Sequence, residues 1–220
     1  MEDKLTISPR DEEAINAATH GFGLACAIAA GVILIYIAAR HGTAAQICGS
    51  CIYAATMISA YAASTLSHLF HVPTLRHAFR IADQAIIFLF IAGTFTPIAF
   101  SYLTHGAWWI LTGLVWLVAL IGFFRKVAFA HRVKLGAVSI GLYILLGWLP
   151  GIALPVMIGT VPGPLLVWVV AGGLCYLGGI LFFQFDDRVP YFHAAWHMMV
   201  IAGTTCHYIG ILMYCTGMNS

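Results

Sequence analysis

Residues 84–124 read QAIIFLFIAGTFTPIAFSYLTHGAWWILTGLVWLVALIGFF, a stretch without a single Asp, Glu, Lys or Arg. A membrane-spanning helix needs about 20 apolar residues, so this stretch is too long for one span. The polar segment Ser101–Gly106 divides it into two. Of all 220 residues, 61% are hydrophobic and 8% are charged, against roughly 25% charged in a soluble domain. The composition excludes a soluble globule and predicts an all-α membrane protein.

The other uncharged stretches divide in the same way and predict a seven-transmembrane helix bundle. Residues 1–16 would form a short cytoplasmic tail, and residues 17–216 the single membrane domain. Pro150 and Pro155 predict that the end of the fifth span kinks or frays, because proline removes a helix hydrogen bond. The predicted spans are about 17–39, 44–70, 81–103, 106–124, 135–157, 164–185 and 191–216.

The basic residues predict the orientation of the bundle. Alternating seven spans places Arg40 on one side of the membrane and the other nine Lys and Arg on the opposite side. The positive-inside rule then predicts a cytoplasmic N-terminus and an extracytoplasmic C-terminus. A miscount by one span would mix the two sets, so the uneven division also favours seven spans. The nine residues are Lys4, Arg10, Arg76, Arg80, Arg125, Lys126, Arg132, Lys134 and Arg188.

Charge and cysteine content exclude several other classes. A net charge of +2, without a run of Lys and Arg, excludes a nucleic-acid partner. The six cysteines lie inside apolar stretches, which disfavours a disulfide framework. Cys48 and Cys51 form a Cys-x-x-Cys pair, but on a predicted span without a second pair nearby, which disfavours redox or metal use. Residues 1–16 are net acidic, so we expect no cleavable signal peptide.

Five polar side chains from three predicted spans should meet near the cytoplasmic boundary. Ser64 and His68 lie four residues apart at the end of the second span, and Asp83 begins the third. His193 and His197, also four residues apart, begin the seventh. Residues at i and i+4 share a helix face. Ionisable side chains in lipid are costly and tend to mark functional positions, so we treat this group as the candidate site.

Three imidazoles and a water form the ligand set of an open, catalytic zinc site. The spacing therefore predicts that His68, His193 and His197 bind Zn²⁺. Asp83 could take a proton from the bound water, and Ser64 could orient Asp83, a ligand or a substrate carbonyl. A single His at a helix end is more often an interfacial side chain. Five polar groups at one depth favour the metal site.

The ordered motifs resemble the haemolysin III-like bacterial branch of the progestin and adipoQ receptor (PAQR) family over residues 11–216. Each motif is weak alone, and the ordered set is highly specific. The motifs are Ser64-x-x-x-His68, Asp83, Ala92-Gly-Thr-Phe-Thr-Pro97, His193-x-x-x-His197, Thr19-His-Gly-Phe-Gly23 and Ala130-His-Arg132.

The resemblance implies a seven-helix protein of the bacterial inner (plasma) membrane with zinc near its cytoplasmic side. In the family, the equivalents of His68, His193 and His197 hold the zinc, and those of Asp83 and Ser64 complete the site around its water. The wider superfamily includes alkaline ceramidases, which implies hydrolysis of a lipid amide and membrane lipids as partners. Some bacterial members are linked to membrane homeostasis. The long cytoplasmic tail of the animal receptors is missing here, which argues against hormone signalling.

Three functions follow from these observations. The first is a zinc-dependent hydrolase of a lipid amide or ester. The alternative is a non-enzymatic sensor or regulator of membrane state in which zinc fixes three helix ends. The third is a haemolysin-like pore, and the scarcity of intramembrane carboxylates beyond Asp83 counts against it.

The remaining histidines receive separate expectations. His20 begins the first span at the depth of the site, and either a role beside the metal or a packing role would fit. His207 should point into the bundle as a hydrogen-bonded core residue, although a relay or substrate contact is a further option. Five others lie at span boundaries and should face solvent or lipid headgroups. These five are His41, His71, His77, His105 and His131.

Overall fold

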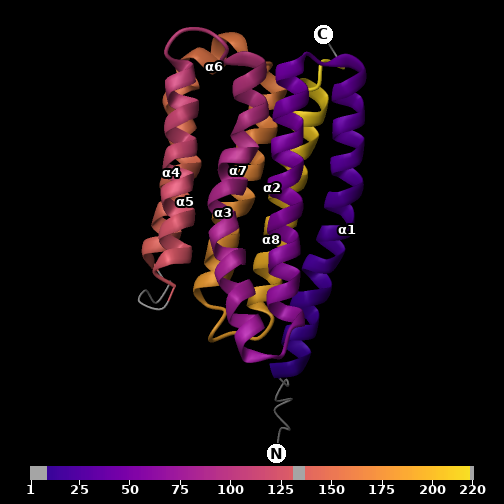
Figure 1. Ribbon diagram of the computed structural model, residues 1–220, viewed down its shortest axis with the longest axis vertical. Helices are drawn as coiled ribbons and strands as arrows, with labels where there is room; N and C mark the ends of the chain where they lie inside the picture. Colours follow the sequence, from indigo (N-terminus) through magenta and orange to yellow (C-terminus); the bar gives the residue numbers. More distant parts are fainter. Residues whose placement is uncertain (1–8, 131–136, 219–220) are drawn as a thin grey trace, which may run out of the picture.

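A computed structural model of the chain describes residues 9–130 and 137–218, and within these ranges it contains helices and no strands (Figure 1). The fold is therefore all-α, as predicted. The elements are α1 (Pro9–His41), α2 (Ala44–Leu69), α3 (Pro73–Tyr102), α4 (Trp108–Ala128), α5 (Ala137–Trp148), the 3₁₀ helix η1 (Leu149–Ala153), α6 (Leu154–Thr160), α7 (Gly163–Gln184) and α8 (Phe192–Tyr214).

Six helical segments of the described residues are long and apolar enough to cross a membrane: α1, α2, α3, α4, the segment Ser139–Thr160, and α7. The seventh predicted span corresponds to α8, which has 23 residues but does not belong to this group. Its three histidines, His193, His197 and His207, lower its hydropathy. The count of seven crossings and the orientation in the membrane stay predictions.

Several helices extend beyond the uncharged stretches that predicted them. α1 begins at Pro9 instead of residue 17, and residues 1–8 of the expected tail lie outside the described ranges. α3 begins at Pro73 instead of residue 81, with proline in the first turn, where its missing N–H costs nothing. Arg76 and Arg80 are therefore helical residues and not loop residues. Charges end a hydrophobic stretch, but they do not end a helix.

The predicted fifth span, 135–157, is divided as its prolines suggested. α5 ends at Trp148, η1 carries Pro150 in its first turn, and α6 carries Pro155 in its first turn. The expected kink is thus confirmed as a 3₁₀ segment between two α-helices. Residues 135 and 136 of this span lie outside the described ranges, as do Lys4, His131, Arg132 and Lys134.

Close packing of α7 on α8 fixes the helix that carries two of the predicted ligands. A Cβ added at Gly172 would lie 2.9 Å from the Gly203 carbonyl oxygen, and one added at Gly179 would lie 2.7 Å from the Trp196 ring. α8 also packs against α1, and α2 packs between α1 and α3. At one end of the bundle, the start of α1, the end of α2 and the starts of α3 and α8 come together (Figure 1).

Candidate metal centre

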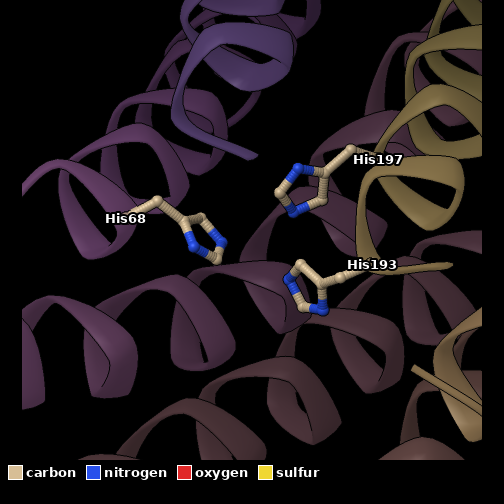
Figure 2. Close-up of side chains that lie close together, drawn as sticks. All are labelled: His68, His193 and His197. Atoms are coloured by element: carbon tan, nitrogen blue, oxygen red, sulfur yellow. The ribbon is translucent and has the colours of Figure 1, made fainter. Parts of the chain in front are cut away.

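The three predicted ligands come together at this end of the bundle. His68 lies in the last turn of α2, and His193 and His197 lie in the first two turns of α8. One nitrogen of each lies within 4.8 Å of the others, and the three rings face one another (Figure 2). His68 and His197 are buried, whereas the His193 side chain is 29% exposed. The cluster therefore has two enclosed members and one that is open to the surroundings.

The spacing of the three rings suits a small ion. Ring centroids are 5.1 Å apart for His68 and His193, 5.1 Å for His68 and His197, and 4.6 Å for the α8 pair. Tetrahedral bonds of 2.0–2.1 Å to zinc place ligand nitrogens about 3.4 Å apart. Side-chain rotations that move each nitrogen by about 1 Å bring the three nitrogens to that separation. The donor set and its geometry thus fit a tetrahedral metal with one further position.

Two of the imidazoles are hydrogen-bonded through Nδ1 to carboxylates outside the cluster. His68 Nδ1 lies 2.7 Å from Glu13 Oε2, and His193 Nδ1 lies 2.7 Å from Asp186 Oδ2. An ionised carboxylate can only accept, so both Nδ1 atoms carry the proton and donate it. Each Nε2 then keeps its lone pair. A carboxylate behind a metal-binding histidine fixes its tautomer and ring orientation.

His197 reaches the same tautomer through a hydroxyl. The Thr19 hydroxyl donates to the Asn16 carbonyl oxygen at 2.9 Å, so its single proton is used. His197 Nδ1, 3.1 Å from the same oxygen, must then be the donor. All three histidines therefore present an unprotonated Nε2, and their three Nδ1 atoms are occupied by groups outside the cluster.

The predicted pair Asp83 and Ser64 lies beside the triad. Asp83 interacts electrostatically with the Ser64 hydroxyl and with His193. His20 Nδ1 lies 2.6 Å from Ser64 Oγ. Ser64 therefore lies between His20, with which it shares a hydrogen bond, and Asp83, with which it interacts electrostatically. Lys126 of α4, 6% exposed, adds a positive charge that interacts with Asp83.

The other histidines agree with the expectations from sequence wherever the structure describes them. His207 Nε2 donates to the Val169 carbonyl oxygen at 3.0 Å, and its ring packs on Tyr176, which is the expected core role. His20 lies at the site, which agrees with the first of its two expected roles, a role beside the metal. The boundary residues that the structure describes are exposed: His41, His71, His77 and His105.

Glu13 and Asp186 are absent from the sequence expectations, and Thr19 appeared there only as the first residue of a motif, without a role. Asp186 stands seven residues before His193, so its position just ahead of the last helix was a usable signal. Glu13 carried none, because its partner lies 55 residues away. α1 thus contributes more to the site than any motif indicated.

Comparison with known proteins gives the chain its family. The model of the family described as haemolysin-III related matches residues 9–208. The chain is 35% identical to the haemolysin-3 of Bacillus cereus, with 97% of each chain covered. It is 33% identical to the haemolysin-3 homolog of Bacillus subtilis (93% of this chain and 94% of the relative). It is 28% identical to the monocyte to macrophage differentiation factor of Homo sapiens (92% and 84%), a PAQR protein.

These matches confirm the resemblance found in the motifs. They extend over nearly the whole chain, and they agree with six helices able to cross a membrane. The bacterial relatives are consistent with a place in the inner membrane. The chain is therefore an integral membrane protein that belongs to the haemolysin III-related family of the PAQR type.

Proposed function

We propose that the protein is a metal-dependent hydrolase of an amide or ester bond in a membrane lipid, ceramidase-like in its chemistry and active in membrane lipid homeostasis. His68, His193 and His197 would hold the ion. The observation that carries the proposal is that three imidazoles, each with its Nδ1 already hydrogen-bonded, come together beside Ser64 and Asp83. When bound, Zn²⁺ supplies a Lewis acid that acidifies a water and polarises a carbonyl.

The protein's own groups would handle the protons. Asp83 is the base that accepts a proton from the attacking water, and it returns that proton to the leaving amine or alcohol. Ser64, which interacts with Asp83, would hold the carboxylate by donating its hydroxyl proton to it. His20 Nδ1, 2.6 Å from Ser64 Oγ, would donate to that oxygen and leave the hydroxyl proton for Asp83.

The position of the site supports a lipid as substrate. His68 and His193 lie at helix ends, and Asp83 lies about three turns inside α3. In an integral membrane protein, such a position would correspond to the depth where headgroups meet acyl chains. The amide and ester bonds of membrane lipids lie at this depth. The 29% exposure of the His193 side chain leaves one side of the triad open to such a group.

A non-enzymatic sensor or regulator of membrane state is the second candidate. One observation favours it: His68 of α2 and His197 of α8 both hydrogen-bond side chains of α1. A metal bound there would hold these helices together, so loss or gain of the metal would change how the helices pack. A pore, the third function suggested by the sequence, gains no support from the arrangement of the described residues.

Asp83→Asn separates hydrolysis from a structural role. Purified full-length protein in nanodiscs would be assayed for metal content and for cleavage of ceramide, phospholipid and N-acyl amide. We expect wild type to cleave at least one of these lipids. Asp83→Asn should keep its metal and lose roughly 10²- to 10⁴-fold in rate, the usual contribution of a general base. If the metal-loaded wild type cleaves none of these lipids, the hydrolase proposal is wrong and the regulator takes its place.

A further inference from the structure

Glu13, near the start of α1, is a shared acceptor for side chains of two other helices. Its Oε2 accepts the His68 Nδ1–H at 2.7 Å. Its Oε1 accepts from Arg76 Nη2 and, at 3.4 Å, from Arg80 Nη2. The Glu13 side chain is 21% exposed, and both of its oxygens are in use. One carboxylate thus joins α1 to a candidate metal ligand on α2 and to two cations on α3.

The preceding residue, Glu12, makes a similar link to α8. Its Oε1 accepts the Tyr191 backbone N–H at 2.9 Å. Tyr191 is the N-cap of α8 and has a left-handed backbone with φ of 64°, a conformation that a bulky residue adopts rarely. His193 follows two residues later. Glu12 therefore fixes the point at which the helix carrying two ligands begins.

We propose that Glu12 and Glu13 form a clasp by which α1 positions the metal ligands. Glu13 orients His68, and Glu12 sets the first turn of α8 and with it His193. Neither carboxylate belongs to the group of converging donor atoms, which comprises the three histidines, so both are positioning residues. The inference rests on the metal site of the proposed function, and it gives a role to Glu12 and Glu13, which none of the quoted motifs contains.

The geometry gives the clasp a physical mechanism. The His68 Nδ1–H donated to an ionised carboxylate keeps Nε2 unprotonated and makes the imidazole a stronger donor to a cation. The guanidinium groups of Arg76 and Arg80 stabilise the ionised form of Glu13 and limit its rotamers. Without the carboxylate, His68 is free to rotate or to place its proton on Nε2. Loss of such an outer partner typically lowers metal affinity roughly 10- to 100-fold.

A purely structural role makes a different prediction. If Glu13 only neutralises Arg76 and Arg80, its loss should lower the stability of the metal-free protein and leave the affinity of the folded protein for metal unchanged. Metal affinity and metal-free stability are therefore the two quantities to measure. Asp11 supplies the matched control, because it is an exposed acid on the same helix turn and carries the same charge.

The test uses full-length protein in nanodiscs, stripped of metal and titrated with Zn²⁺ against a chromophoric chelator. The variants are Glu13→Gln, Glu12→Gln and Asp11→Asn. We expect roughly 10- to 100-fold weaker binding for Glu13→Gln, a smaller loss for Glu12→Gln, and affinity within about twofold of wild type for Asp11→Asn. Cobalt bound in place of zinc should show an altered absorption spectrum in Glu13→Gln alone, because the His68 ring is reoriented.

Two outcomes would overturn the clasp, and they are distinguishable. Wild type that binds no metal removes the proposed site and the clasp together. Wild type that binds metal, with Glu13→Gln and Glu12→Gln as tight as Asp11→Asn, removes the clasp alone. If Glu13→Gln does not fold, Glu13→Asp keeps the charge and withdraws the carboxylate by one methylene. An unchanged metal affinity in that folded variant would equally contradict the clasp.

Discussion

His20 stacks on His197, with ring centroids 3.6 Å apart and ring planes inclined by 21°, while its Nδ1 holds Ser64. One side chain of α1 thus contacts a proposed metal ligand through its face and the hydroxyl beside the proposed base through its edge. The hydrogen bond can be removed while the stacked ring is kept, which makes His20 informative.

His20→Phe keeps an aromatic ring against His197 and removes the hydrogen bond to Ser64. We expect this variant to bind metal within about threefold of wild type and to hydrolyse lipid about tenfold more slowly, the effect of losing about 1.4 kcal/mol of orientation. His20→Ala removes both contacts and should lower metal affinity as well. Chelator competition and a lipid-cleavage assay on the same preparations check both statements. Equal metal affinity in the two variants would show that the stacked ring does not position His197.

Ser64→Ala removes the hydroxyl that links His20 to Asp83. We expect hydrolysis to fall about tenfold while metal content stays stoichiometric, because the hydroxyl orients the base and ligates nothing. Ser67→Ala is the matched control. Ser67 is buried on the same helix, and its hydroxyl donates to the Ser64 carbonyl oxygen. A Ser67→Ala variant as slow as Ser64→Ala would mean that local helix packing, and not the hydroxyl of Ser64, is responsible.

Asp186→Ala removes the carboxylate behind His193. Metal affinity should fall roughly 10- to 100-fold, since the imidazole loses the partner that fixes its tautomer. Asp187→Ala, the exposed neighbour, should bind metal as wild type does. Isothermal titration calorimetry measures the metal affinity of both variants. Similar affinities for the two would leave the hydrogen bond of 2.7 Å without a role in metal binding.

Gly172→Ala tests whether the seating of α8 on α7 matters to the site. The added Cβ would press against the His207 ring and lie 2.9 Å from the Gly203 carbonyl oxygen. Both groups belong to α8, so the two helices must separate, at a cost of about 1–3 kcal/mol. We expect a lower unfolding temperature and weaker metal binding, because α8 carries two ligands. Gly173→Ala places its methyl in open space and should leave both quantities unchanged or slightly raised. Equal unfolding temperatures for the two variants would contradict the packing argument.

The sequence predicted the core of the site because its evidence was positional. Charge placement set the direction of the helices, and direction brought Ser64, His68, Asp83, His193 and His197 to one end. The structure adds the hydrogen bonds that hold these groups. They come largely from α1, whose contacts with α2 and α8 depend on how distant helices pack and not on spacing along the chain.

Helix ends were the second feature that the sequence could not provide. Spans drawn from uncharged stretches start α1 and α3 about two turns late. Those extra turns are where Glu13 and Arg76 lie. A charged residue costs free energy in the hydrocarbon but none in a helix that continues past it into the headgroups. Because the spans were drawn from uncharged stretches, they left out the charged residues that flank the site.

The metal content and coordination of the purified protein test the central claim most directly. Elemental analysis of wild type and of His193→Ala would be followed by X-ray absorption at the edge of whatever metal is found. The account predicts about one zinc per wild-type chain, with three imidazole nitrogens at about 2.0–2.1 Å, and loss of most of that zinc in His193→Ala. A wild-type protein without stoichiometric metal, or a His193→Ala protein with unchanged metal content and coordination, would contradict it.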